Sequence, residues 1–211
     1  YYHPNVYIIN TSTDTKKYSV KKSINRSGKY KFVSLGGAIN PYDSEKILKV
    51  IMDLNSMGID SSIDFINKFD HEYIKQISNN LNFPKEKLKI YSLPHNEISI
   101  ALNKFDFGFI FIKTSEFRRV CSPTKLGELM SSGIPILGLK GIDVLDEYER
   151  KYNFIINLDP EKIFLKNKEY TQFLIKFIHK HHDPIRIRDT ALKNFDLEKA
   201  CLKYKKLYQS I

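Results

Sequence analysis

The chain has 211 residues, 42% of them hydrophobic and 27% charged, and 34 Lys plus Arg against 24 Asp plus Glu give it a formal net charge of +10. This length and composition allow one substantial buried core or two small ones and exclude a mostly disordered protein, and no apolar run approaches the roughly 20 residues that span a bilayer. Two distant cysteines, Cys121 and Cys201, exclude a disulfide scaffold and a thiolate zinc site, which favours a reducing, cytoplasmic setting.

Short apolar runs alternate with amphipathic segments along most of the chain. Because the chain begins with Tyr, we expect it to be a fragment. Its first 29 residues hold one short apolar segment, Val6–Ile9, before a polar, lysine-rich stretch typical of a linker. The later runs predict strands at Tyr30–Leu35, Ser62–Asn67, Leu88–Tyr91, Phe107–Ile112, Ile134–Leu139 and Asn153–Asn157. The segments between them predict helices at Ser44–Met57, Glu72–Leu81, Asn96–Asn103, Thr124–Ser132 and Val144–Tyr152.

This alternation predicts an α/β fold, a Rossmann-like, doubly wound parallel sheet of about six strands with helices on both faces. Most of the strands are continuously apolar, as buried parallel strands are. Ligands of such sheets bind at the carboxyl ends of the strands, so we expect function in the strand-to-helix loops. After Asn157 only helical spacing remains, and it predicts a helical tail with helices at Glu169–His182, Pro184–Asn194 and Leu197–Tyr208.

The excess of positive charge raises the question of a polyanionic partner. Lysines are scattered through every predicted helix, they far outnumber arginines, and no nucleic-acid-binding module accompanies them. We therefore interpret the charge as a solvated surface and expect no nucleic-acid partner. Attraction to an anionic membrane surface stays open as a secondary effect.

The segment from Cys121 to Ile136 carries the chemistry. Ser122 is a suitable N-cap, Pro123 suits the first helical position, and Gly133 stands where a helix stop is expected. A helix of about nine residues is thereby delimited. Its first free backbone N–H groups are predicted at Thr124, Lys125 and Leu126.

A helix N-terminus at the mouth of a parallel sheet presents unpaired donors and a partial positive charge, which suit phosphate oxygens. Lys125 adds a full positive charge there, and Glu128 follows Thr124 by one turn on the same helix face. A carboxylate beside bound phosphates suits a pair of vicinal hydroxyls, such as a ribose provides. The segment thus predicts a nucleotide site.

The residues from Ser122 to Glu128, followed by Gly-Ile-Pro-Ile at 133–136, resemble the donor-site signature of family 4 glycosyltransferases, the large retaining group built from two Rossmann-like domains. The likeness covers nearly the whole chain. Val6–Tyr18, with Asn10 and Asp14, resembles the interdomain linker, Phe32–Gly37 resembles the first strand and glycine turn of the C-terminal domain, and Asp106–Phe111 resembles the strand before the signature loop. The last helices resemble the tail that packs on the partner domain. The N-terminal, acceptor-binding domain is the half that this chain lacks.

The resemblance implies that a nucleoside-diphosphate sugar is the donor, that the sugar passes to an acceptor hydroxyl with net retention, and that neither a metal nor another cofactor is needed. It assigns the ribose to Glu128 and the diphosphate to the N–H groups of Thr124 and Lys125, with Ser122 and Leu126 beside them. The glycine turn at Gly36 and Gly37 would let the diphosphate approach closely. Ser92 and Leu93 fall where the family contacts the base.

Two departures from the family pattern concern the donor site. The family has a first glutamate eight positions before Glu128, where it contacts the donor sugar, and this chain has Val120 there, with Glu116 four residues too early to replace it. The Arg and Lys that many members carry after the first glycine are also absent. Phosphate neutralisation would then fall to Lys125, helped by three further cationic residues, Arg118, Arg119 and Lys68.

Three further groups of residues have both a functional and a structural interpretation. Cys121 could be a nucleophile or a small buried hydrophobe, and the structural interpretation is favoured because no histidine partner is apparent. His179, His181, His182 and Asp183 could form a metal site, or the histidines could simply complement the dipole at the end of a helix. The structural interpretation is again favoured. Base or sugar stacking competes with core packing for Tyr42, Phe65 and Tyr91.

The sequence therefore predicts a linker and partial strand at 1–29, a nucleotide-sugar-binding domain at 30–182 and C-terminal helices at 183–211. As implied by the family, we expect a hexosyltransferase half, inactive alone, that serves bacterial polysaccharide, lipopolysaccharide or capsule synthesis in the cytoplasm or at the inner face of the membrane. Two alternatives stay open. One is a sugar-nucleotide epimerase or glycogen-phosphorylase-like enzyme of the same architecture, and the other is a non-enzymatic basic module that binds polyanions.

Overall fold

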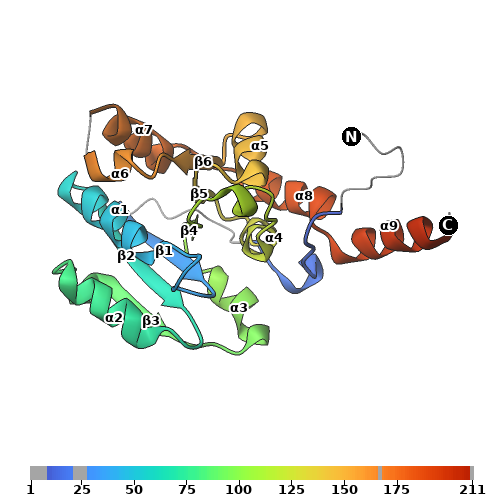
Figure 1. Ribbon diagram of the computed structural model, residues 1–211, viewed down its shortest axis with the longest axis horizontal. Coiled ribbons are helices and arrows are strands. Elements are labelled where there is room, and N and C mark those ends of the chain that lie inside the picture. The colour runs from blue at the N-terminus through green and yellow to red at the C-terminus, as the bar shows by residue number, and fades with distance from the viewer. Residues whose placement is uncertain (1–8, 21–27, 166–167, 210–211) are drawn as a thin grey trace.

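A computed structural model describes residues 9–20, 28–165 and 168–209 of the chain. At its centre lies a six-stranded parallel sheet in the order β3-β2-β1-β4-β5-β6 (Figure 1). The strands are β1 (Lys29–Leu35), β2 (Asp60–Ile66), β3 (Leu88–Tyr91), β4 (Phe107–Ile110), β5 (Ile136–Leu139) and β6 (Ile155–Leu158). The order reverses between β1 and β4, which is the topological switch point of a doubly wound sheet. The predicted Rossmann-like fold is thus confirmed.

Helices cover both faces of the sheet, each over its own apolar core. One core is built with α1 (Ser44–Ser56), α2 (His71–Asn80), α6 (Lys162–Leu165) and α7 (Lys168–His179), and the other with α3 (His95–Leu102), α4 (Thr124–Ser131), α5 (Asp143–Lys151) and α8 (Pro184–Asn194). Successive residues of β1 alternate between them, since Phe32 belongs to the first core and Val33 to the second. Burial on both faces explains why the second half of this strand, Phe32–Leu35, is mostly apolar, whereas its exposed start carries Lys29 and Lys31.

β3 has its predicted bounds, β1 begins one residue early, and β2 begins two residues early and ends one residue early. The ends of β4 and β5 differ because their end residues make other contacts. β4 stops at Ile110 rather than Ile112, since Ile112 forms an antiparallel bridge with Tyr42. β5 starts at Ile136 rather than Ile134, since Ile134 N donates to Leu129 O and closes the preceding helix. β6 lies two residues further along than predicted and ends at Leu158.

Most helices begin and end within one residue of their predicted bounds, and the exception is the predicted helix Glu169–His182. α7 ends at His179. His182 lies beyond that end and its Nε2 is 2.9 Å from Phe177 O, while Asp183 caps the next helix by accepting from Ile185 N. The short helix α6 carried no signal that periodicity could detect, because it is a single turn.

The segment 9–20 packs against α4 and the C-terminal helices. Arg188 of α8 donates to the carbonyls of Thr15, Tyr18 and Ser131, which joins this segment to the end of α4. Gly127 permits the approach, because a Cβ there would contact the Thr13 side chain. The predicted apolar segment Val6–Ile9, apart from Ile9, and residues 21–27 of the polar stretch lie outside the described residues.

The last helix, α9 (Leu197–Gln209), extends away from the body of the molecule (Figure 1). Ala200 is its buried residue, whereas Leu202 and Tyr208 are exposed by 58% and 74%. Within the described ranges, none of the helices is both long and apolar enough to cross a bilayer.

Candidate functional site

The carboxyl ends of β1 and β4 border a cavity of about 300 Å³ at the switch point of the sheet. Its walls also come from the loop before α1 and from the segment leading into α4, and they include Ser34, Tyr42, Arg118, Ser122, Thr124 and Lys125. Both charged side chains that line it in the described part of the chain, Arg118 and Lys125, are cationic. An anionic ligand therefore suits this cavity.

The N-terminus of α4 faces this cavity with unpaired donors. Within the described residues, the N–H groups of Thr124 and Lys125 have no hydrogen-bond acceptor. Leu126 N–H donates to Pro123 O at 3.1 Å, so the prediction of a third free N–H was wrong. The two remaining groups and the helix dipole give the site its partial positive charge.

Ser122 does not cap α4, which corrects another expectation. The helix begins at Thr124, Pro123 occupies the N-cap position, and no side chain caps it. The Ser122 hydroxyl instead accepts from Thr11 N at 3.2 Å, and its carbonyl accepts from Thr11 Oγ1 at 2.7 Å. A tertiary partner from the segment 9–20 thus replaces the local capping bond, and Ser122 holds that segment beside the site.

Lys125 and Glu128 form an ion pair one turn into α4. Lys125 Nζ lies 3.1 Å from both carboxylate oxygens, and the side chains are 25% and 8% exposed. The Glu128 charge also acts on Tyr18, whose hydroxyl pKa is raised by burial and then by this carboxylate. Glu128 is therefore a nearly buried carboxylate with a cationic partner that is itself accessible to a ligand.

The predicted glycine turn lies against the same lysine. Gly36 has a φ of +89°, a conformation that side-chain-bearing residues rarely adopt, and a Cβ there would lie 3.2 Å from Lys125 Cε. A Cβ on Gly37 would lie 2.7 Å from the Tyr42 ring. The turn after β1 and the start of α4, which are far apart in sequence, are thus brought together.

The two arginines before α4 have different surroundings. Arg118 lines the cavity and donates to Lys113 O at 3.3 Å. Arg119 points to Asp143, with Nε 3.5 Å from its carboxylate, and does not line the cavity. Of this pair, Arg118 is the one placed to meet a phosphate.

The remaining predicted contacts lie outside the cavity walls. Lys68 is exposed and its Nζ stands 5.0 Å over the ring of the exposed Phe69. The Ser92 hydroxyl donates to Asn67 O at 2.9 Å, and Leu93 lines a separate groove. Ser92 and Leu93 still lie in the loop after β3, at the same edge of the sheet as the cavity.

The loop that should carry the family's first glutamate is exposed. Val120 is 79% exposed, and Phe117, inside the 3₁₀ turn Glu116–Arg118, is 90% exposed. Cys121 is half-buried, and burial raises the pKa of its thiol, which keeps it protonated at neutral pH. A protonated thiol is a poor nucleophile, so the structural interpretation of Cys121 is favoured.

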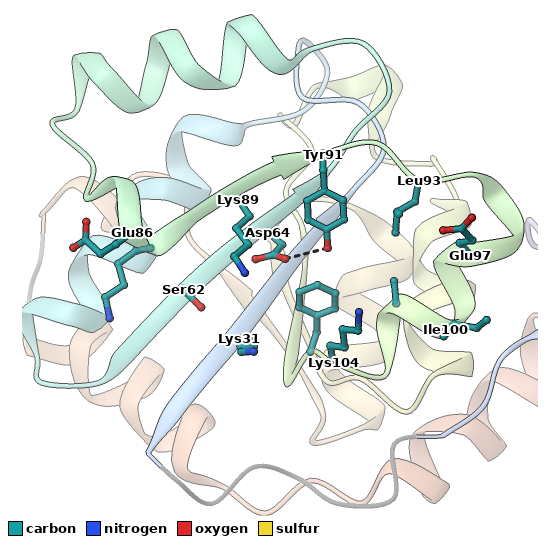
Figure 2. A pocket seen from close by; sticks show the side chains of 13 residues that line it. Lys31, Ser62, Asp64, Glu86, Lys89, Tyr91, Leu93, Glu97, Ile100 and Lys104 are labelled. Atoms are coloured by element: carbon teal, nitrogen blue, oxygen red, sulfur yellow. Dashed lines mark hydrogen bonds between the residues drawn. The ribbon is translucent and has the colours of Figure 1, made fainter.

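A larger groove of about 770 Å³ lies on one face of β1, β2 and β3 (Figure 2). At its floor the Tyr91 hydroxyl donates to Asp64 at 3.0 Å, and burial raises the pKa of that carboxyl. Four lysines and three carboxylates line it, at Lys31, Lys87, Lys89, Lys104, Asp64, Glu86 and Glu97. These charges nearly cancel, and the groove runs mainly along the face of the strands, reaching a carboxyl end only at Tyr91 and Leu93 of the edge strand β3 and its loop. The smaller cavity, with its cationic lining at the carboxyl ends of the strands, is therefore the better candidate for an anionic ligand.

Among the three aromatic candidates for stacking, Tyr42 lines the smaller cavity and Tyr91 the larger groove, whereas Phe65 is 1% exposed in the core. The predicted core role is thus confirmed for Phe65. Tyr42 has its ring against the glycine turn, where it can contact a ligand that reaches Lys125.

The histidines near residue 180 have separate surroundings. His182 is 3% exposed and packs edge-on against Phe107, and His179 lies beside the Tyr30 hydroxyl. Asp183 is committed to capping α8. Within the described ranges, no group of three His, Cys, Asp or Glu side chains is arranged to hold a metal ion.

The buried His182 predicts a pH-dependent stability. Burial lowers its pKa below the value of about 6.5 expected in the unfolded chain, so the unfolded chain binds the proton more readily. Stability is then full above pH 6.5 and falls as the pH drops towards the folded-state pKa, by at most about 1.4 kcal/mol per pH unit for one proton.

We expect H182Q to flatten this dependence, measured as urea unfolding free energy between pH 7.5 and 5, whereas H181Q, at an exposed position, should retain it. An equal slope in both variants would contradict the prediction.

Two residues at this edge of the sheet had not been singled out from the sequence, Asn67 and Asp70. Asn67 directly follows β2 and is 4% exposed, and Asp70 stands at the N-cap of α2 without making a side-chain capping bond. A polar pair directly after a strand is the sequence signal that could have indicated them. Their partners lie in the glycine turn.

Comparison with known proteins shows the fold alone. No family model and no curated protein matches the chain. The C-terminal domain of a group 1 glycosyl transferase from Francisella tularensis matches with a TM-score of 0.54 and 13% identity, over 90% of this chain and 96% of that one. The Anabaena protein HepE, solved with UDP-glucose, matches with a TM-score of 0.66 and 14% identity, over 95% of this chain and 56% of its own.

The pneumococcal O-GlcNAc transferase GtfA, solved with UDP and GlcNAc, has a TM-score of 0.65 and 12% identity, over 96% of this chain and 38% of its own. The chain thus spans about 38% to 56% of the length of these larger enzymes, and nearly all of the isolated Francisella domain. With its parallel sheet in the order 3-2-1-4-5-6 and its C-terminal helices, the chain has the fold of the C-terminal domain of a two-Rossmann-domain, group 1 glycosyltransferase.

Proposed function

We propose that this chain is the donor-binding half of a retaining glycosyltransferase, which transfers a sugar from a nucleoside diphosphate to an acceptor hydroxyl. The observation that carries the proposal is the start of α4, where two free N–H groups open into a cationic cavity next to Gly36 and Lys125. Proteins of the same fold have been solved with UDP and with UDP-glucose, which supports the same class of ligand here.

In this proposal the diphosphate lies at the start of α4. The N–H groups of Thr124 and Lys125 donate to its oxygens, and the side chains of Lys125 and Arg118 neutralise its charge. Because the chain supplies this positive charge itself, we propose that donor binding needs no metal. Ser122 and Leu126 take a supporting part in this proposal, since the Ser122 hydroxyl and carbonyl accept from Thr11 and Leu126 N–H donates to Pro123 O.

Glu128 would bind the ribose by exchange of partners. In the free chain its carboxylate accepts from Lys125 Nζ, 3.1 Å away. A bound diphosphate attracts Lys125 more strongly than a single carboxylate does, because it carries more negative charge. Lys125 then turns to the phosphates, and the freed carboxylate accepts hydrogen bonds from the two ribose hydroxyls.

The transfer itself breaks the bond between the anomeric carbon and the β-phosphate oxygen. The acceptor oxygen forms the new bond to the same carbon, and its proton leaves with the diphosphate. The residues of this half stabilise the negative charge that develops on the leaving diphosphate, and we assign no covalent nucleophile to it. Acceptor recognition falls to the N-terminal domain, so we propose that the chain alone is inactive.

Exposed apolar side chains support a partner domain at the carboxyl edge of the sheet. Ile39, Phe69, Phe117 and Val120 are 48%, 80%, 90% and 79% exposed, and all lie in loops that follow strands at this edge. Isolated domains rarely leave several large apolar groups uncovered on one edge. We therefore propose that the N-terminal domain docks here, with residues 1–29 as linker, 30–182 as donor domain and 183–211 as the tail that reaches it.

We extend the proposal to a hexosyltransferase of bacterial polysaccharide, lipopolysaccharide or capsule synthesis. The net charge of +10 favours contact with an anionic surface, which suits work at the inner face of the cell membrane.

Calorimetric titration with UDP, GDP, ADP and CMP tests the donor site. We expect one nucleoside diphosphate to bind with unit stoichiometry, and duplex DNA not to displace it. If none of the four binds while DNA does, with a steep salt dependence, the chain is a polyanion-binding module and the proposal fails.

A further inference from the structure

Hydrogen bonds centred on Asn67 join the three loops that follow β1, β2 and β3. The Asn67 amide nitrogen donates to Gly36 O at 2.6 Å and to Asp70 Oδ2 at 3.1 Å. Its amide oxygen accepts from Phe69 N at 2.9 Å and from Asp70 N at 2.5 Å. Both amide hydrogens and the amide oxygen of this nearly buried side chain are therefore hydrogen-bonded to the surrounding loops.

Asp70 completes the arrangement from the other side of the glycine turn. Its Oδ2 accepts from Ala38 N at 2.7 Å. That hydrogen bond, followed by the one from Asn67, holds the pKa of Asp70 below its usual range, so the carboxylate is charged at neutral pH. Gly37 thus lies between the Gly36 carbonyl, which accepts from Asn67, and the Ala38 amide, which donates to Asp70. The peptide groups on both sides of Gly37 are therefore fixed in orientation.

The orientation has a geometric consequence for the donor site. In a trans peptide the N–H points opposite to the C=O, and Asn40–Pro41 is the cis bond recorded among the described residues. Because Gly36 C=O points to Asn67 after β2, Gly37 N–H points away from β2. β4 and α4 lie on that side of β1, and within the described part of the chain Gly37 N–H has no acceptor.

We propose that Asn67 and Asp70 are positioning residues that hold the Gly36–Gly37 turn so that Gly37 N–H is aimed at a donor phosphate. This rests on the proposed function, and it adds a donor opposite the start of α4. The two sets of N–H groups would then hold the diphosphate from both sides of the switch point. Neither Asn67 nor Asp70 touches the donor itself.

The loop after β3, where the family resemblance implies the base contact, is held by a different part of Asn67, which makes the role separable. Ser92 Oγ donates to the backbone carbonyl of Asn67 at 2.9 Å, and Asn67 N donates to Tyr91 O at 3.0 Å. Side-chain substitution at position 67 removes the bonds to the turn and leaves these backbone bonds. The phosphate part of binding should therefore weaken while the base part does not.

The test compares UDP with uridine, or the corresponding pair for whichever base the wild-type chain binds. We expect N67A to weaken the diphosphate at least tenfold, measured by calorimetry, with nucleoside affinity by NMR unchanged. D70A should behave likewise, and D70N should recover most of the affinity because its amide oxygen can still accept from Ala38 N. In N67A and D70A, hydrogen exchange at the Ala38 amide should become faster.

Asn55 offers a matched control. Its side-chain amide donates to Ile51 O at 2.8 Å and to Ser61 O at 2.9 Å, at the opposite edge of the sheet. N55A should lower the Tm by an amount comparable to N67A and leave UDP affinity unchanged. Equal loss of affinity in both variants would show a merely structural role and overturn the proposal.

The failure of this inference differs from the failure of the proposed function. A wild-type chain that binds none of the nucleotides overturns the function, and the aiming of Gly37 at a phosphate falls with it. A wild-type chain that binds UDP, together with an N67A variant of the same affinity or the same Ala38 exchange rate, overturns the positioning role alone.

Discussion

Replacing Glu128 by Ala is expected to weaken binding of the nucleoside diphosphate about 5- to 150-fold, which corresponds to about 1–3 kcal/mol for hydrogen bonds to a charged group. The carboxylate is 8% exposed and is held at the site by Lys125 alone among the cations that the structure describes near it. In the proposed complex, the ribose hydroxyls would lose their acceptor without it. Titration calorimetry of both proteins with the same nucleotide measures the difference.

Two variants serve as controls for this prediction. E128Q keeps an acceptor oxygen of the same shape but loses the charge, so its affinity should lie between those of wild type and E128A. E147A removes a carboxylate from an exposed pair with Lys151 on α5 and should not change binding. If E128A binds the nucleotide as tightly as E147A, the ribose role of Glu128 is wrong.

Replacing Phe107 by Ala is expected to destabilise the fold by about 3–5 kcal/mol, the range for a large aromatic deleted from a packed core. Phe107 begins the central strand β4 and is 2% exposed. Its ring centroid lies 5.2 Å from that of Phe32, 5.9 Å from Phe177 and 5.8 Å from the His182 ring. The cavity would therefore open between the sheet and α7, where little can collapse into it.

Urea unfolding measures this effect, since the midpoint should fall without a large change in slope. F173A on α7 is the matched control, because Phe173 is 44% exposed and loses little buried area. Its unfolding free energy should change by well under 1 kcal/mol. A Phe107 variant as stable as the Phe173 variant would mean that this junction is not packed as described.

Local patterns in the sequence predicted the α/β alternation well, for a physical reason. In β4, no polar side chain interrupts the strand because both of its faces are covered, and in α1 apolar residues recur with helical spacing because one face is buried. These requirements act within a few residues, so one chain read alone reveals them. Boundaries were less accurate where a distant loop competed, as Tyr42 does for Ile112 at the end of β4.

The helix that carries the candidate site shows where local rules stop. Gly133, with a φ of +73°, follows the end of α4 as predicted. A glycine can end a helix through its own left-handed backbone conformation, without a partner from elsewhere in the chain. Ser122 has the right type and position for an N-cap, yet Thr11, 111 positions away, takes its hydroxyl. Capping preference is worth about 1 kcal/mol, which one tertiary hydrogen bond can offset.

The sequence by itself determined the succession of strands and helices, the resemblance of the segment around Glu128 to a donor site, and the place of that segment at the carboxyl edge of a parallel sheet. Only the tertiary structure decided that Lys125 pairs with Glu128 and lies against Gly36, and that Asn67 holds the glycine turn. Burial patterns record whether a residue faces the core but not which residue it meets there. That choice depends on strand order and on how the loops at one edge of the sheet pack, which involves residues far apart in the chain.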